Sequence, residues 1–196
     1  MNVDAMKDKT VIVTGATKGM GLASSLRLLE LGANVVMVYC SDAANASQVE
    51  SQLATYSDQM LLLQADITQA GSRQAILNQT LETFKQVDVL VNNAGVAAKS
   101  GFLKEAEDAY DVVMDVNLKA PIFLAKLIAK QMIEQNKGGS IINFSSISGH
   151  RGAGAISYDA AKAGLIRATQ TMANALGQYG IRVNSISPGA HRTDMN

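Results

Sequence analysis

Tyr158 and Lys162 are the two residues whose types and spacing most directly suggest chemistry. In a helix, residues four apart lie on one face, so the lysine ammonium would lie beside the tyrosine phenol. A free phenol, with a pKa of about 10, is a poor proton donor or acceptor at neutral pH, and a neighbouring cation shifts that pKa downward. The pair is therefore a candidate general acid and base for a carbonyl or an alcohol. Such spacing is also common on solvated helix faces, so it needs support from elsewhere in the chain.

The elements that must position this pair alternate along the chain. Short runs rich in valine, isoleucine and leucine separate longer segments of helical periodicity, which predicts a parallel sheet between helices. The expected strands are 10–14, 34–39, 60–65, 87–92, 140–145 and 181–186. The expected helices are 20–31, 43–56, 69–84, 105–116 continuing into 118–135, and 158–179. The fold class is thus α/β, a doubly wound Rossmann-type parallel sheet in three layers, with its ligand at the carboxyl ends of the strands.

The amino-acid composition limits the classes of partner that this protein is expected to bind. Lysine plus arginine and aspartate plus glutamate both number 17, so the charge balance gives no reason to expect nucleic acid or a membrane surface. No apolar run reaches the roughly 18 residues of a membrane span, and no signal peptide is visible. Cys40 is the one cysteine, which fits a reducing compartment. We therefore expect residues 1–196 to form a single cytoplasmic domain, with no metal site because His150 and His191 are far apart.

A glycine-rich turn follows the first expected strand. Gly15, Gly19 and Gly21 have the spacing Gly-x-x-x-Gly-x-Gly and lead directly into an amphipathic helix. Glycine permits a tight turn and lets backbone N–H groups approach a pyrophosphate, whose charge is also stabilised at a helix N-terminus. The spacing is neither the common Gly-x-Gly-x-x-Gly fingerprint nor a phosphate loop. Its position after the first strand is what favours a dinucleotide site over an ordinary turn.

Three motifs together resemble those of the short-chain dehydrogenase/reductase family. The glycine-rich turn, the sequence Asn-Asn-Ala-Gly at 92–95 and the Tyr158-x-x-x-Lys162 pair occur in the family's order. The resemblance, which is to 3-oxoacyl-carrier-protein reductase-like members in particular, runs from about residue 9 to the end of the chain. Other matching positions are Asp66, Asn117, the pair Ser145-Ser146, Pro188, Gly189 and Thr193. It implies an NADP-dependent oxidoreductase that interconverts a ketone and a secondary alcohol.

The resemblance also implies the catalytic roles. Tyr158 would give a proton to the carbonyl oxygen, Lys162 would lower the tyrosine pKa and hold the nicotinamide ribose, and Asn117 would anchor a water linking the lysine to solvent. A serine after the fifth strand would hydrogen-bond the substrate oxygen. The family's usual spacing of thirteen residues before the tyrosine selects Ser145, whereas the strand end selects Ser146, twelve residues before it. We favour Ser146, because a one-residue deletion in the loop is easier to accommodate than a strand shift that turns the side chain over.

The cofactor site implied by the resemblance lies at the strand ends. Its residues would be Gly15, Thr17, Lys18, Gly19, Met20, Gly21, Asp66, Ile67, Asn93, Ala94, Gly95, Tyr158, Lys162, Pro188, Gly189 and Thr193. An acidic residue ending the second strand would bind the 2′-hydroxyl of NAD, but no carboxylate occurs there until Asp42. Lys18 would pair with the 2′-phosphate of NADP, as a basic residue does there in the family, although Cys40 stands where an arginine is usual. We expect NADP, with NAD as the alternative.

The sequence leaves alternatives open for the C-terminal part of the fold and for the oligomeric state. Family members continue beyond the sixth strand into a helical flap over the substrate and a seventh strand. The resemblance therefore implies that the C-terminal part of the family fold is missing here, either because the chain is incomplete or because it is naturally short. The alternative function is a nucleotide-binding sensor or interaction protein with little or no turnover. The helices at 118–135 and 158–179 resemble those of a family dimer interface, which implies a homodimer, with a homotetramer as the alternative, acting on a small carbonyl or alcohol substrate.

Overall fold

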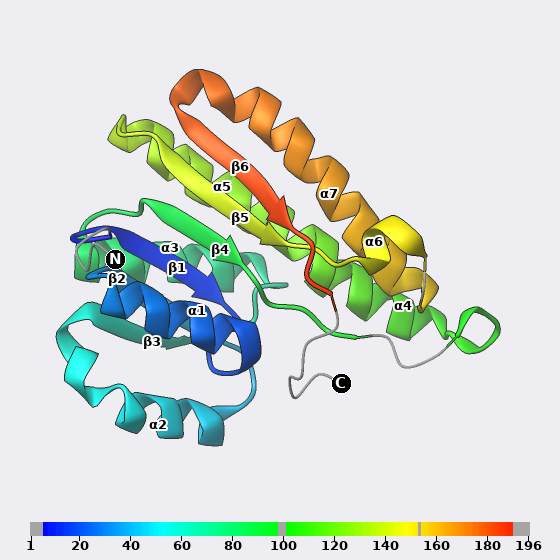
Figure 1. The fold of residues 1–196 in the computed structure, drawn as a ribbon, viewed down its shortest axis with the longest axis horizontal. Helices are drawn as coiled ribbons and strands as arrows, with labels where there is room; N and C mark the ends of the chain where they lie inside the picture. The colour runs from blue at the N-terminus through cyan, green and yellow to red at the C-terminus, as the bar shows by residue number, and fades with distance from the viewer. Residues whose placement is uncertain (1–5, 98–100, 153, 190–196) are drawn as a thin grey trace.

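The strands of the protein form one parallel sheet. The computed structural model describes residues 6–97, 101–152 and 154–189, and within these the spatial order of the strands is β3-β2-β1-β4-β5-β6 (Figure 1). This order confirms the predicted doubly wound fold, in which the chain reverses direction across the sheet between β1 and β4. The strands are β1 (Thr10–Thr14), β2 (Asn34–Tyr39), β3 (Met60–Gln64), β4 (Val89–Asn92), β5 (Gly139–Phe144) and β6 (Ile181–Ile186).

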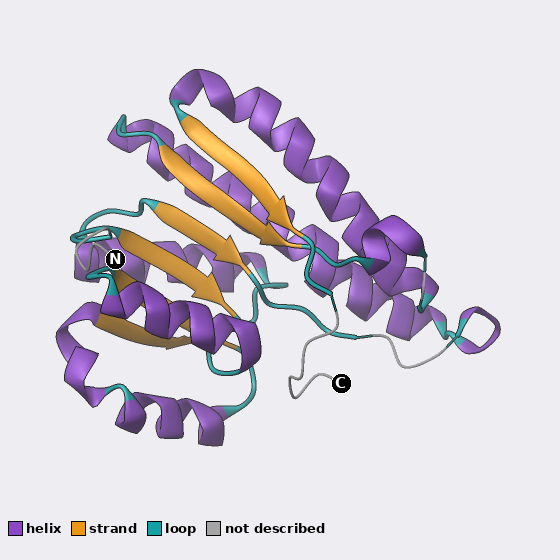
Figure 2. Cartoon of the chain, viewed as in Figure 1, coloured by secondary structure: helices purple, strands orange, loops and turns teal. Residues whose placement is uncertain are grey.

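Helices pack on both faces of the sheet (Figure 2). The α-helices are α1 (Gly19–Glu30), α2 (Ala43–Gln52), α3 (Ala70–Phe84), α4 (Glu107–Met114), α5 (Ala120–Gln135), α6 (Ser148–Arg151) and α7 (Ile156–Leu176). Short 3-10 segments occur at η1 (Ala54–Gln59), η2 (Phe102–Lys104) and η4 (Gly177–Tyr179), and a π-helical turn, η3 (Asp115–Lys119), joins α4 to α5. None of the described helices is long and apolar enough to cross a membrane.

Successive strand residues pack into two different cores. In β1, Ile12 lies in the cluster that α3, α5 and α7 cover, whereas Val11 and Val13 lie in the cluster that α1 and α2 cover. All three side chains are fully buried. A sheet buried on both faces has strands that are hydrophobic throughout rather than alternating, which is why these runs could be found in the sequence.

The observed boundaries differ from the predicted ones where side chains replace regular backbone pairing. The fourth strand begins at Val89 rather than at 87, because the side-chain amide of Gln135 binds both the N–H and the carbonyl of Val87, at 3.0 and 2.9 Å. The fifth strand ends at Phe144, one residue earlier than predicted. The helix predicted at 43–56 gives way to η1 after Gln52, and the helix predicted at 158–179 spans Ile156–Leu176. The four-residue α6 was missed, because it is too short to carry a periodic pattern.

Candidate active site

In the glycine-rich turn between β1 and α1, the backbone lies so close to neighbouring atoms that a side chain would not fit. Gly15 and Gly19 have φ angles of +63° and +53°, in the left-handed region that other residues rarely adopt. A Cβ atom on Gly21 would lie 2.1 Å from the carbonyl oxygen of Gly15 and 2.5 Å from Nδ2 of Asn93. The turn therefore brings the start of α1 directly against the end of β1.

Hydrogen bonds from Thr14 and Asn93 join the ends of β1 and β4. Oγ1 of Thr14 accepts from the N–H groups of Asn93 and Ala94, both at 3.0 Å. Nδ2 of Asn93 donates to the carbonyls of Thr14 and Gly15, at 2.9 and 3.0 Å. These bonds fix the crevice between the two strands where the strand order reverses, which is where ligands of doubly wound sheets bind.

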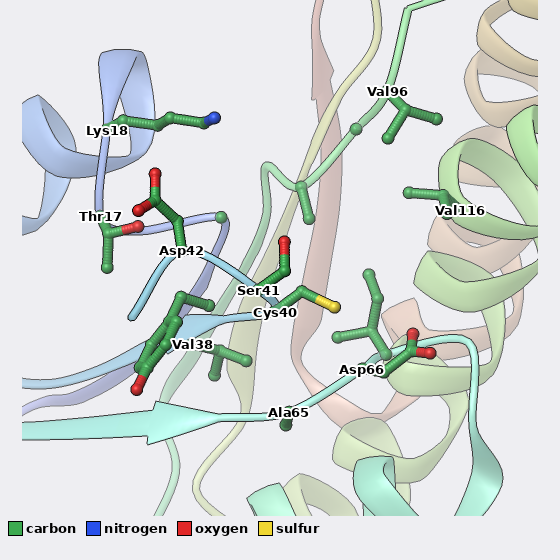
Figure 3. Close-up of a pocket in the computed structure, with 15 residues that line it drawn as sticks. Thr17, Lys18, Val38, Cys40, Ser41, Asp42, Ala65, Asp66, Val96 and Val116 are labelled. Carbon is green, nitrogen blue, oxygen red and sulfur yellow. The ribbon is translucent and has the colours of Figure 1, made fainter. Parts of the chain in front are cut away.

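A pocket of about 280 Å³ opens beside this crevice (Figure 3). Predicted residues in its lining are Gly15, Thr17 and Lys18 from the glycine-rich turn, Asp66 and Ile67 after β3, and Ala94 and Gly95 after β4. The predicted site lacks the other lining residues, which are Val38, Tyr39, Cys40, Ser41, Asp42, Ala65, Val96 and Val116. Val96 follows the Asn-Asn-Ala-Gly motif directly, so its position carried a signal. Val116 lies in a helix and is brought to the pocket only by the tertiary fold.

Asp66 and Cys40, which both line the pocket, have shifted pKa values. Oδ1 of Asp66 accepts from the backbone N–H and the hydroxyl of Thr68, at 2.9 and 2.8 Å. These bonds, the backbone one foremost, hold the pKa of Asp66 below its usual range. Burial, and then the Asp66 carboxylate, raise the pKa of the Cys40 thiol. Cys40 is therefore a neutral thiol at physiological pH, and Asp66 is ionised.

Asp42, the first carboxylate after β2, is engaged in helix capping. Its Oδ1 accepts from the backbone N–H of Asn45 at 3.1 Å, at the start of α2. Nδ2 of Asn45 in turn donates to the carbonyl of Thr17 at 2.7 Å. Thr17, Lys18 and Asp42 lie on the side of the pocket away from Val116 (Figure 3). This side of the pocket therefore carries the exposed ammonium of Lys18 and the carboxylate of Asp42, which is hydrogen-bonded to the backbone N–H of Asn45.

The Tyr158 and Lys162 pair lies on the first two turns of α7. Nζ of Lys162 lies 5.6 Å from the centroid of the Tyr158 ring and donates to the carbonyl of Phe144, at the end of β5, at 2.8 Å. Lys162 is 4% exposed, whereas Tyr158 is half-buried. Burial lowers the pKa of Lys162 to about 8. The amine therefore lies close to the Tyr158 ring, and it loses its proton at a lower pH than a free lysine does.

The two serines after β5 have different surroundings. Ser145 is 5% exposed, and its hydroxyl donates to the backbone carbonyl of Lys162 at 2.8 Å. Ser146 is half-buried, and its Oγ accepts from the N–H of Ser148 at 3.1 Å. Ser145 therefore holds α7 against the sheet. Ser146 keeps its hydroxyl proton for another acceptor.

Asn117 is completely buried in the π-helical turn. Its side chain forms two hydrogen bonds with Val96, donating to the carbonyl at 2.8 Å and accepting from the N–H at 2.9 Å. A Cβ atom on Gly95 would lie 2.9 Å from Oδ1 of Asn117 and 3.5 Å from Nζ of Lys162. Gly95, which lines the pocket, therefore lies next to both the pocket and the amine of Lys162. π-Helical turns are rare and often occur at functional sites.

Of the remaining predicted positions, Pro188 and Gly189 lie near these groups. The carbonyl of Pro188 accepts from the N–H of Ile147 at 3.1 Å, which places the end of β6 beside Ser146. A Cβ atom on Gly189 would lie 3.9 Å from the side chain of Ile147. The side chain of Met20 lines a separate apolar groove rather than the pocket. Thr193 lies outside the described residues. Among the described residues, no group of three or more His, Cys, Asp or Glu side chains could hold a metal ion.

Comparison with known proteins decides the family. The family model described as short chain dehydrogenase matches residues 9–196. The chain belongs to the short-chain dehydrogenase family. A 3-oxoacyl-[acyl-carrier-protein] reductase of Synechocystis is 35% identical to this short-chain dehydrogenase over 192 residues, or 97% of this chain and 77% of the relative. An L-rhamnose 1-dehydrogenase (NAD(P)(+)) of Azotobacter vinelandii is 38% identical over 194 residues, or 96% of this chain and 75% of the relative.

Solved structures agree with this assignment. A short-chain type dehydrogenase/reductase from Mycobacterium marinum superposes on this short-chain dehydrogenase with a TM-score of 0.92 at 28% identity, covering 99% of this chain and 77% of that one. Acetoin dehydrogenase from Salmonella typhimurium superposes with a TM-score of 0.87 at 33% identity, covering 96% of this chain and 75% of that one. The protein is therefore an oxidoreductase enzyme whose family binds nicotinamide nucleotides.

Proposed function

We propose that this short-chain dehydrogenase interconverts a ketone and a secondary alcohol with NADP, using Tyr158 as the proton donor for reduction. The observation that carries the proposal is the buried amine of Lys162, which lies 5.6 Å from the Tyr158 ring centroid. A cation at that place stabilises the phenolate that remains after proton transfer. The half-buried hydroxyl of Ser146, near the same helix, is the proposed donor to the substrate oxygen.

The residues of the pocket fit a dinucleotide. The glycine-rich turn has no space for a Cβ atom at Gly21 or Gly15, and the positive φ angles of Gly15 and Gly19 allow the backbone to turn tightly. Backbone N–H groups at the start of α1 suit a pyrophosphate. Ile67 and Asp66 would contact the adenosine part, and Gly95 leads from the pocket toward Lys162. When bound, the nicotinamide supplies the hydride.

The chain's own residues then account for positioning and proton transfer. The amine of Lys162 donates to the carbonyl of Phe144, and this bond helps to hold it near the Tyr158 ring. The two bonds from Asn117 to Val96 fix the backbone beside Gly95. These contacts establish the geometry before substrate arrives, which is how preorganised groups lower a reaction barrier.

The preference for NADP over NAD is supported by the two charged residues at the mouth of the pocket. The Asp42 carboxylate, which would be needed for the ribose hydroxyls of NAD, accepts the hydrogen bond that caps α2. Lys18 is exposed at the same end and would pair with a 2′-phosphate. An L-rhamnose 1-dehydrogenase relative is named for both NAD and NADP, so the preference is a matter of degree.

A ketone or secondary alcohol is the proposed substrate class, because relatives are named 3-oxoacyl reductases and acetoin dehydrogenase.

We also propose a homodimer formed through α5 and α7. Phe123 on α5 and Ile156 on α7 are each 45% exposed, which leaves apolar surface on both helices for a partner. Light scattering that shows only monomer would refute the dimer. The lone Cys40 supports a reducing compartment, and we place the enzyme in the cytoplasm.

The test of the proposed function is NADPH oxidation with a panel of short and long ketones, repeated with NADH. We expect turnover with at least one ketone and a higher kcat/KM with NADPH. Binding of NADPH without turnover on any ketone, or on any secondary alcohol in the reverse direction, would instead favour a nucleotide-binding protein. A higher kcat/KM with NADH would overturn the cofactor preference alone.

A further inference from the structure

A carboxylate from a distant segment holds the first turn of α7. Glu105 lies between η2 and α4, 52 residues before Ser157. Its Oε2 accepts from the backbone N–H of Ser157 at 3.2 Å, and its Oε1 accepts a hydrogen bond from the Ser157 hydroxyl. Ser157 has no exposed surface. Both hydrogen bonds are partly buried, which strengthens them relative to bonds in open water.

The start of α7 requires such an acceptor. The first N–H groups of a helix have no partner within the helix, and negative charge is favoured beside them. The residue at the N-cap position of α7 is Ala155, whose side chain cannot accept a hydrogen bond. Asp159 accepts from the N–H of Gly154 at 2.9 Å, outside the helix. Glu105 supplies the acceptor for Ser157, which directly precedes Tyr158.

We propose that Glu105 is a positioning residue, which places the Tyr158 hydroxyl for proton transfer by fixing Ser157. The inference rests on the proposed role of Tyr158. A general acid must lie within hydrogen-bond distance of the atom it protonates, and a displacement of about 1 Å costs up to about a hundredfold in rate. Glu105 acts through Ser157 and does not itself contact the reacting atoms.

The rest of the site is held by separate contacts. One turn further along α7, the Lys162 carbonyl accepts from Ser145 and its amine donates to Phe144. Removal of the Glu105 carboxylate would therefore loosen the end of α7 that carries Tyr158 and leave the Lys162 turn anchored to β5. The expected result is a loss of kcat with little change in the binding of NADPH.

The experiment compares Glu105→Ala and Ser157→Ala with Glu107→Gln, a charge change at an exposed residue two positions away. We expect kcat to fall about tenfold or more in Glu105→Ala, with the NADPH dissociation constant within about twofold of wild type. Glu107→Gln should leave both unchanged. The double variant Glu105→Ala/Ser157→Ala should be no slower than Glu105→Ala, because the partner of the serine hydroxyl is already gone. An unchanged kcat in Glu105→Ala would overturn the proposal.

Amide hydrogen exchange gives a readout that does not depend on turnover. In Glu105→Ala we expect the Ser157 N–H to exchange at least about tenfold faster, while the N–H of Lys162 keeps its rate. A slower enzyme without faster exchange at Ser157 would overturn the positioning role. If wild type itself turned over no substrate, the proposed function and the catalytic part of this inference would both fail. The exchange rate at Ser157 would then decide whether Glu105 anchors the helix.

Discussion

The hydroxyl of Ser145 donates to the backbone carbonyl of Lys162 at 2.8 Å. This bond joins the end of β5 to the helix that carries the lysine, and it leaves the Ser145 hydroxyl proton engaged. Ser146, the next residue, is half-buried and accepts only a backbone N–H through its Oγ among the described contacts. The two neighbouring serines therefore differ in their contacts: Ser145 joins α7 to β5, and Ser146 is the serine that we propose binds the substrate oxygen.

Replacing each serine by alanine should separate these functions. In Ser146→Ala we expect kcat to fall about a hundredfold, because a hydrogen bond to the developing charge on the substrate oxygen is lost. In Ser145→Ala we expect a loss of about 1 kcal/mol or more in the free energy of unfolding, because the bond to Lys162 is buried. Steady-state kinetics and urea unfolding of both variants measure the two effects. Turnover that survives in Ser146→Ala and collapses in Ser145→Ala would reverse the assignment.

Burial of Lys162 should appear in the pH dependence of stability. Its pKa is about 8 in the folded protein and 10.5 in the unfolded chain, so the unfolded state binds more protons between these values. The free energy of unfolding therefore gains up to about 3 kcal/mol from this group as pH rises through that window. Below pH 8, Lys162 is protonated in both the folded and the unfolded state, so the cost of burying its charge lowers the free energy of unfolding in full. Lys162→Met should lack this rise, and urea unfolding of both proteins from pH 8 to pH 10.5 would measure the difference. Parallel curves would contradict a buried, easily deprotonated amine.

The glycine-rich turn should not accept a methyl group at Gly21. A Cβ atom there would lie 2.1 Å from the Gly15 carbonyl oxygen, so Gly21→Ala must displace the backbone of the turn. We expect it to cost about 1–3 kcal/mol of stability and to weaken NADPH binding. Gly71, in the first turn of α3, is the matched control, because no atom lies within 4 Å of a Cβ placed there. Gly71→Ala should be neutral or stabilise by about 0.5–1 kcal/mol. Equal NADPH dissociation constants in calorimetry for both variants would show that the turn does not bind the cofactor.

Lys18 should determine much of the preference for NADP. A charged hydrogen bond of this kind contributes about 1.5–3 kcal/mol, so Lys18→Ala should raise KM for NADPH about tenfold or more. KM for NADH should stay near its wild-type value, because NADH has no 2′-phosphate. Lys85→Ala removes a cation at the other end of the sheet and controls for net charge. The ratio of kcat/KM for the two cofactors measures the effect. An unchanged ratio in Lys18→Ala would mean that Lys18 does not contact the phosphate.

Local patterns were sufficient to predict the elements and the side of the sheet that carries the site. Strands buried on both faces produce continuous apolar runs, and ligands of such sheets bind where the strands end. Gly15, Asp66 and Gly95, which line the pocket, all follow strand ends. The contacts of Glu105 with Ser157 could not be predicted, because the two residues are 52 positions apart and nothing in the local pattern pairs them. The same holds for the Gln135 amide that ends the pairing of β4. Such contacts depend on how whole elements pack.

The most direct test of the central claim is the rate of NADPH-dependent ketone reduction by Tyr158→Phe. Phenylalanine keeps the ring beside Lys162 and removes only the hydroxyl. We predict that kcat falls by about 10²–10⁴-fold, the usual contribution of a general acid, while NADPH still binds with a dissociation constant within about twofold of wild type. A Tyr158→Phe enzyme that reduces the ketone at the wild-type rate would contradict the account.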